Sequence, residues 1–168
     1  MAISQLQSAF TRFSRVPMSL STAGWWKDVP GAPGWYFIET DTPLPILEQL
    51  PAPPQGTKLY DISERIRYNN WLRQNGLAIL PSPSGGSFVV YAGEQLNLRN
   101  RAREHTHGNS GTACLRLSTY PQLANYAWSF CYLTCDSVFP GSNGDKALRA
   151  LGEQTWRGLH GWPLLCKE

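Results

Sequence analysis

Arg101 and His105 stand four residues apart in the helix-like segment RNRAREH, which closely follows an apolar run ending in Tyr91. Residues four apart share one face of a helix and lie about one turn from each other. A guanidinium and an imidazole on one face can bind an anion and move a proton. A solvated helix face explains the pair equally well, so a chemical role needs support from elsewhere in the chain.

Glu153 is the second candidate, in the segment ALRALGEQTWRGLHGWPLL. As a carboxylate it is a suitable hard ligand for Mg²⁺ or Mn²⁺. Arg149 and Arg157 lie four residues to either side, so Glu153 can equally belong to an ion-pair ladder worth only ~0.3–0.5 kcal/mol per pair. The neighbouring Gly152 costs a helix interior about 1 kcal/mol and marks either close backbone packing or a helix irregularity.

Three strands and three helices must position these side chains. Aromatic and β-branched residues predict strands at 35–40, 87–93 and 126–134. Asp61 with Glu64 three residues later forms a capping-box pattern, which predicts a helix over residues 61–76. A cationic helix is expected at 94–105. The last helix should begin after Asp145 and pack through an apolar stripe. The members of that stripe are Ala147, Leu148, Leu151 and Leu159.

The remaining segments give weaker signals. Residues 1–24 predict a short helix or an arm, and the proline-rich stretch TPLPILEQLPAPPQG predicts an extended surface connection without a regular helix. The order of elements indicates an α+β fold with a small three-stranded antiparallel sheet flanked by helices. We expect an N-terminal arm over 1–29 and a single domain over 30–168, with a long insertion at about 41–86 between the first two strands.

The order of these features resembles the GIY-YIG nuclease family. GWY at residues 34–36 takes the place of the first motif and YAG at 91–93 that of the second, with Trp35 and Ala92 replacing the middle isoleucines. An arginine follows Tyr91 by ten residues, a histidine by fourteen, and a glutamate lies in the last predicted helix. The resemblance covers about residues 33–166 and implies that the two motifs lie on neighbouring antiparallel strands.

Site residues follow from the resemblance one by one. It implies catalytic roles for Tyr36, Tyr91, Arg101, His105 and Glu153, with Glu153 as the ligand of Mg²⁺ or Mn²⁺. The arginine would bind phosphoryl oxygens, and Tyr36 or His105 would deprotonate water, a choice that the sequence leaves open. Many relatives carry an asparagine after the last helix, where this chain has Cys166.

The expected function is therefore a metal-dependent DNA endonuclease, of the restriction or defence type and possible as a homodimer. Two alternatives stay open. One is a non-catalytic module on the same fold that binds nucleic acid or a protein, and the other is a toxin or repair nuclease acting on RNA or branched DNA. Basic residues on the insertion and on the cationic helix are candidates for DNA contacts. They are Arg65, Arg67, Arg73, Arg99, Arg103 and His107.

Two further groups allow more than one interpretation. His105 and His107 form a His-Thr-His pair that could bind a metal, although a surface role or a contact with nucleic acid fits its place before a glycine-rich loop better. Trp25, Trp26, Tyr68 and Trp71 could stack on bases or, as the favoured interpretation, pack the core and dock the inserted helix.

The composition limits the class of protein to which the chain can belong. The chain has 168 residues, 42% apolar residues and a net charge of +3, which suits one globular domain and permits an acidic partner without demanding one. Its apolar runs are too short for a membrane-spanning helix. Four cysteines stand at spacings without a disulfide or zinc pattern, and the apolar stretch around Cys131 and Cys135 predicts buried, reduced thiols for that pair. A cytoplasmic location is expected.

Overall fold

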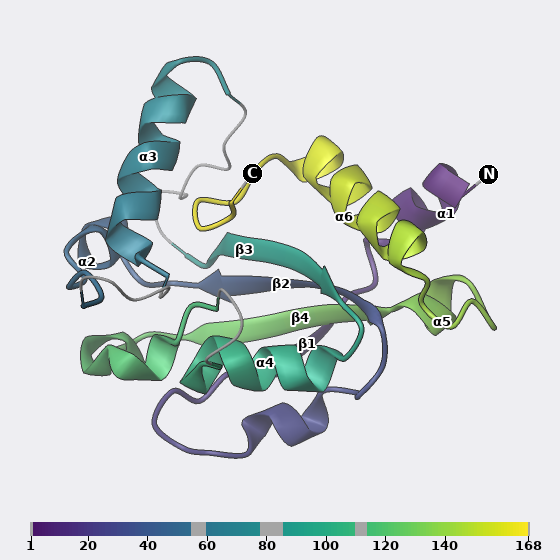
Figure 1. The fold of residues 1–168 in the computed structure, drawn as a ribbon, viewed down its shortest axis with the longest axis horizontal. Helices are drawn as coiled ribbons and strands as arrows, with labels where there is room; N and C mark the ends of the chain where they lie inside the picture. Colours follow the sequence, from purple (N-terminus) through teal and green to yellow (C-terminus); the bar gives the residue numbers. More distant parts are fainter. Residues whose placement is uncertain (1, 55–59, 78–85, 110–113, 168) are drawn as a thin grey trace.

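A computed structural model describes residues 2–54, 60–77, 86–109 and 114–167. The fold is α+β, with a four-stranded antiparallel sheet and six α-helices in the described residues (Figure 1). The strands are β1 (Ser14–Pro17), β2 (Gly34–Thr40), β3 (Phe88–Gln95) and β4 (Trp128–Thr134). The α-helices are α1 (Ala2–Ala9), α2 (Leu44–Glu48), α3 (Ile62–Gln74), α4 (Leu98–His107), α5 (Cys135–Val138) and α6 (Lys146–His160). Short 3₁₀ helices are η1 (Trp25–Asp28), η2 (Leu117–Thr119) and η3 (Pro121–Asn125).

The sheet has the strand order β1-β4-β2-β3, so β2 is a central strand and β3 lies at an edge. In the β2–β3 pair, Tyr36 lies opposite Gly93 and Ile38 opposite Tyr91, with an irregularity after Ile38. Directly opposite residues point to the same face of a sheet. Tyr36 and Tyr91 therefore lie on the same face of two neighbouring strands.

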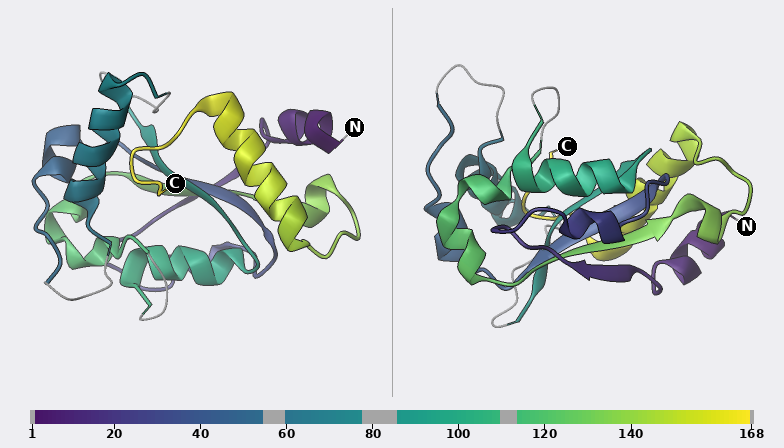
Figure 2. Two further views of the ribbon diagram at one scale, coloured as in Figure 1. Left: turned by 45° about the horizontal axis from the view of Figure 1, so that its top comes forward. Right: turned by 90° about the horizontal axis from the view of Figure 1, so that it is seen from below.

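Helices α4 and α6 cover opposite faces of the sheet (Figure 2). Leu98 and Ala102 of α4 pack in one apolar cluster with Tyr36 and Ile38, whereas Trp156 of α6 packs in a second cluster with Trp35. Trp35 and Tyr36 are consecutive on β2 and point to opposite faces, as strand geometry requires. The GWY segment thus contributes one aromatic side chain to each layer.

Local capping signals in the sequence are confirmed. The Asp61 side chain accepts a hydrogen bond from the Glu64 backbone N–H at 2.9 Å, and Asp145 accepts one from Ala147 at 2.7 Å. The cationic helix begins later than expected because residues 94 and 95 continue β3 and Asn97 caps α4.

Two expected elements are corrected by tertiary contacts. The sheet has four strands instead of three, because Ser14–Pro17 pairs with β4 at the edge opposite β3. The proline-rich stretch contains the short helix α2, which has a proline in its first turn, where the missing N–H costs nothing, and which buries Leu47. The division into an arm and a domain stays a prediction, although α1 and β1 both lie within residues 1–29.

Helix α6 packs differently from the expected apolar stripe. Its buried residues are Arg149, Gly152 and Trp156, while Leu151 and Leu159 are exposed. Gly152 lies directly on the Trp35 indole, so that a Cβ atom at this position would overlap the ring. The Trp35 Nε1–H donates to the Arg149 carbonyl at 2.8 Å. Contact with Trp35, rather than a leucine stripe, therefore selects the buried face.

The described part of the insertion holds the C-terminal segment against the outer edge of β3. Asn69 on α3 donates to the carbonyls of Leu164 at 2.7 Å and Cys166 at 3.2 Å, and the Tyr60 hydroxyl donates to the Leu165 carbonyl. The Leu165 backbone N–H donates to the Val90 carbonyl at 2.8 Å. In Figure 1 the C-terminal segment accordingly lies between α3 and α6, beside β3.

Burial and helix length bear on three more expectations. All four cysteines are free and buried, which confirms the prediction for Cys131 and Cys135. Trp25 and Trp26 pack against the core, whereas Tyr68 and Trp71 are exposed, so the interpretation of this second pair as core residues is wrong. Among the described residues, the helices fall short of the length and apolar character that a bilayer-spanning segment requires.

Candidate functional site

Tyr36 and Tyr91 form the floor of the candidate site on the α4 face of the sheet. Their rings stack with centroids 6.1 Å apart, and Tyr36 also stacks on Phe130 at 4.9 Å. A Cβ atom on Gly93 would lie 2.9 Å from the Tyr36 hydroxyl. Glycine in the YAG segment therefore makes room for the tyrosine of the GWY segment across the strand pair.

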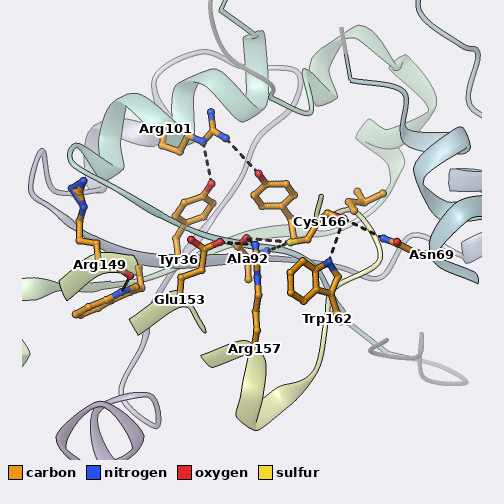
Figure 3. Close-up of polar contacts among 12 residues, drawn as sticks. Tyr36, Asn69, Ala92, Arg101, Arg149, Glu153, Arg157, Trp162 and Cys166 are labelled. Carbon is orange, nitrogen blue, oxygen red and sulfur yellow. Dashed lines mark hydrogen bonds and ion pairs between the residues drawn. The ribbon is translucent and has the colours of Figure 1, made fainter. Parts of the chain in front are cut away.

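Arg101 on α4 connects the two tyrosines (Figure 3). Its Nε–H donates to the Tyr36 hydroxyl at 3.0 Å and one terminal nitrogen donates to the Tyr91 hydroxyl at 3.5 Å. The other terminal nitrogen lies 3.1 Å from Glu104 Oε2, in an ion pair within the helix. Three elements, β2, β3 and α4, thus contribute to one hydrogen-bonded cluster.

His105 completes the cluster and is fully buried. Its Nε2 lies 2.9 Å from the Tyr36 hydroxyl, and the Leu115 backbone N–H donates to its Nδ1 in a long bond of 3.4 Å. A neutral ring that accepts at Nδ1 carries its proton on Nε2. The Tyr36 oxygen therefore accepts hydrogen bonds from both His105 and Arg101.

Burial dominates the electrostatics of this cluster. It raises the pKa of Tyr36 well above the usual value, Tyr91 adds to the rise, and Arg101 counteracts with a smaller effect. Burial also raises the pKa of Tyr91 and lowers that of His105 well below its usual value, with a further decrease from the charge of Arg101. Both tyrosines and the histidine are consequently neutral near pH 7.

Glu153 lies beyond the edge strand from Arg101, and its contacts match the ion-pair interpretation in part. Its Oε1 is 2.5 Å from Nη2 of Arg157, whereas Arg149 pairs instead with Glu94 on β3 at 2.7 Å. Burial raises the pKa of Glu153, Glu94 adds to the rise, and Arg157 and Arg101 counteract it. Arg101 is therefore close enough to act on Glu153 electrostatically.

Arg157 and Cys166 both contact Ala92 on β3 (Figure 3). Arg157 donates to the Ala92 carbonyl at 3.2 Å and lies over the Trp162 ring at 4.2 Å. The Ala92 N–H donates to Cys166 Sγ at 3.2 Å, and the pKa of this thiol is raised to about 11, mainly by burial. Cys166 is thus a neutral, buried thiol against the YAG segment.

The donor set permits one mode of metal binding. Groups of three or more His, Cys, Asp or Glu side chains arranged to hold an ion are absent from the described ranges. Mg²⁺ binds commonly through one or two carboxylates, with water and phosphate oxygens as the other ligands. Glu153, 19% exposed at its side chain, fits that mode if Arg157 shares the carboxylate.

The predicted DNA contacts fall into two groups. Arg67 and Arg73 are exposed on α3 and Arg65 is half-buried beside them, far along the chain from α4. Arg99, Arg103 and His107 follow one another along α4 at four-residue spacing and are exposed.

On α4, contacts with neighbouring elements limit what the second group can do. Arg99 donates to the Val29 carbonyl at 2.8 Å, and the His107 ring packs on Trp26 with centroids 5.0 Å apart. His105 is buried and His107 exposed, so the two histidines do not share a direction.

Several residues of the site escaped the sequence analysis. Glu104 anchors Arg101 and also accepts from Asn109 at 3.1 Å, and its spacing of three from Arg101 was an available signal. Asn69 acts through a contact across 95 residues of chain, and Arg157, which the sequence analysis named as a partner of Glu153, also contacts the Ala92 carbonyl across 65 residues. Local sequence carries no sign of such contacts.

Comparison with known proteins gives no match: no family model, curated protein or solved structure matches this chain.

Proposed function

We propose that this protein is a metal-dependent endonuclease of the GIY-YIG type that hydrolyses phosphodiester bonds in DNA, with a restriction or defence role. One observation carries the proposal: Arg101 donates to the hydroxyls of both motif tyrosines, and His105 joins the same cluster. Helix spacing alone explains the proximity of Arg101 and His105. It does not explain why two tyrosines from separate strands meet them, which is what the family resemblance implies.

Arg101 is suited to stabilise the negative charge that builds up on a phosphoryl group during hydrolysis. Glu104 and the two tyrosines fix its guanidinium in a largely buried position. A preorganised donor in such surroundings is typically worth about 3–4 kcal/mol of transition-state stabilisation.

Tyr36 is the better candidate for accepting a proton from the attacking water. Its oxygen has two donors, Arg101 and His105, and hydrogen bonds to a charged form favour that form. His105 donates through Nε2 and is not the base in this arrangement. Because burial raises the pKa of Tyr36, the phenolate is a small fraction at neutral pH and its fraction increases as pH rises.

Glu153 would hold Mg²⁺ or Mn²⁺ together with water and phosphate oxygens. When bound, the ion supplies Lewis-acid stabilisation of the phosphate and the leaving oxygen. Arg157 would then keep the carboxylate in place from α6 while its own planar group rests on Trp162. Cleavage of both DNA strands would favour a homodimer or two successive nicks.

A second candidate is a non-catalytic module on the same fold that binds nucleic acid or a protein. The Glu153–Arg157 ion pair favours it, because the arginine neutralises the one carboxylate assigned to the metal. A toxin or repair nuclease acting on RNA or branched DNA would share the chemistry of the leading proposal and differ in substrate alone.

Cleavage of supercoiled plasmid and genomic DNA with Mg²⁺ or Mn²⁺ tests the proposal. Wild type should cut, and Arg101→Ala and Glu153→Ala should each lower the rate by about 10²–10³-fold. Lys146→Ala is the matched control, since this cationic residue is exposed on α6, the helix that carries Glu153, and is not among the candidate DNA contacts. Its rate should stay within about threefold of wild type, as expected of a surface substitution.

Binding and unfolding measurements on the same variants separate chemistry from folding. Wild-type protein that is folded and binds DNA but cuts neither DNA nor RNA with either metal would favour the module. Equal cutting by wild type and both site variants would mean that Arg101 and Glu153 are wrongly assigned.

A further inference from the structure

Three side chains on the outer face of α3 form a layered stack. Arg65 lies over the Tyr68 ring with its guanidinium carbon 5.3 Å from the centroid, and Tyr68 stacks on Trp71 with centroids 6.1 Å apart and planes inclined by 28°. The three residues are spaced by three along the helix, which places them one above the other on its surface. We call this row the α3 stack.

The two aromatic rings of the α3 stack are exposed on the surface of the helix. Trp71 is 56% and Tyr68 40% exposed, while the helix docks through its other face, with Ile62, Ile66 and Asn69 buried. Isolated exposed apolar residues are common, whereas two large aromatic rings stacked on each other form a contiguous apolar patch, which is typical of an interaction site. Its exposure points to a ligand.

Charge around the stack selects the class of ligand. Arg67 and Arg73 are exposed on the same helix and Arg65 belongs to the stack, against the one acidic residue of α3, Glu64. The excess of positive charge attracts a polyanion. Flat aromatic faces beside arginines suit unpaired nucleobases, which stack on them with little dependence on sequence.

The far end of α3 leads toward the candidate site. Leu77, just past the helix, lines a groove of about 510 Å³ together with Arg157 and Trp162. Arg157 is the residue that holds Glu153. The groove therefore joins the segment that follows α3 to the residue that pairs with Glu153.

We propose that the α3 stack binds unpaired bases of a nucleic acid, so that single-stranded or locally opened DNA is the preferred form. This assignment rests on the proposed function for its choice of nucleic acid as the partner. It deepens that function by naming the substrate form, and it does not require that the protein cuts.

Binding is measured by fluorescence anisotropy with a labelled oligothymidylate and with a duplex of the same length. EDTA is present so that the DNA is not cleaved during the measurement. The single strand should bind more tightly than the duplex. Trp71→Ala should raise the single-strand dissociation constant about tenfold, as expected for the loss of one stacked base. Trp71→Phe should restore most of the affinity, because the aromatic face returns.

Two control variants separate stacking from other effects. Leu96→Ala removes an apolar side chain that is 59% exposed on another part of the surface, and it should change affinity less than twofold. Arg67→Ala should weaken the binding of both forms of DNA. For the single strand it should lower the slope of log affinity against log salt concentration by about 0.7, because it removes a phosphate contact.

Three outcomes would overturn the proposal: unchanged single-strand binding by Trp71→Ala and Tyr68→Ala, no binding of either DNA by wild type, or self-association in sedimentation that Trp71→Ala abolishes while DNA binding persists. The last result would make a second copy of the chain the partner. Tight single-strand binding that depends on Trp71, in a protein that never cuts, would support the α3 stack and contradict the nuclease.

Discussion

At the scale of single residues, burial decides which charges the candidate site can carry. Tyr36 is 2% exposed, and burial keeps it neutral despite the charge of Arg101. His105 is fully buried, and the charge of Arg101 adds to the effect of burial that keeps it neutral. The family resemblance predicted that Tyr36 and Tyr91 lie beside Arg101 and His105, and these four side chains do meet. It could not predict their burial, which depends on Phe130, Leu115 and the rest of a core gathered from distant segments.

His105 should make the stability of the protein depend on pH. Its pKa is lowered in the folded protein, so the unfolded chain, with a histidine pKa of about 6.5, binds more protons in acid. Stability from this group is complete above about pH 6.5 and is lost as pH falls from there toward the folded pKa. Urea unfolding of His105→Gln should show a smaller loss of stability between about pH 7 and pH 5 than wild type.

His107→Gln is the control for that measurement, since His107 is exposed on the same helix. It should keep the wild-type pH dependence. An equal slope in wild type and His105→Gln would contradict a neutral, buried His105.

At the scale of elements, the residues that cap helices could be predicted from the sequence, whereas the face that a helix buries could not. Asp61 and Asp145 signal their helices through contacts with residues two or three positions ahead, which are visible in sequence. The buried face of α6 is set by Trp35, from a strand more than one hundred residues earlier. Strand β1 was missed for a similar reason, because its four residues are mostly exposed and only pairing with β4 makes them a strand.

Two glycines of α6 should respond in opposite ways to the same substitution. Alanine improves helix propensity by about 1 kcal/mol at either position. At Gly152 the added Cβ would overlap the buried Trp35 ring, and overpacking of a rigid core typically costs about 1–3 kcal/mol. Denaturant unfolding should therefore find Gly152→Ala less stable than wild type.

Gly158→Ala is the matched control, because a Cβ at that position meets nothing within 4 Å. It should be more stable than wild type by up to about 1 kcal/mol. A stabilised Gly152→Ala would mean that α6 does not press on Trp35 as described.

At the scale of the whole molecule, the insertion and the C-terminal segment form one unit. Asn69 donates to two carbonyls of the C-terminal segment, and Leu165 and Cys166 in turn bond to β3 beside Tyr91. Sequence reasoning assigned the insertion to DNA contacts by its basic residues. It could not detect that the opposite face of α3 holds the last buried residues of the described chain.

Substitution of Asn69 should weaken the attachment of the C-terminal segment to α3. Asn69→Ala removes the donor to the Leu164 carbonyl and leaves the Cys166 carbonyl with only the long bond from Trp162 Nε1 at 3.4 Å, which costs about 1–3 kcal/mol in total. Hydrogen exchange should become faster in the peptide that contains Leu165, together with a lower free energy of unfolding. Asn70→Ala is the control, because its side chain is half-buried and bonds to Glu48 instead. Equal rates of hydrogen exchange in the two variants would contradict the role of Asn69 in holding the C-terminal segment.

The capped edge of β3 also bears on how copies of the protein behave toward one another. An open sheet has two edges whose unpaired backbone groups can recruit strands from other molecules. Here β1 is short and carries Arg15 and Pro17, while the outer edge of β3 is covered by Leu165 and Cys166. Release of the C-terminal segment would uncover a long apolar edge strand, so partial unfolding at that end is the expected first step of aggregation.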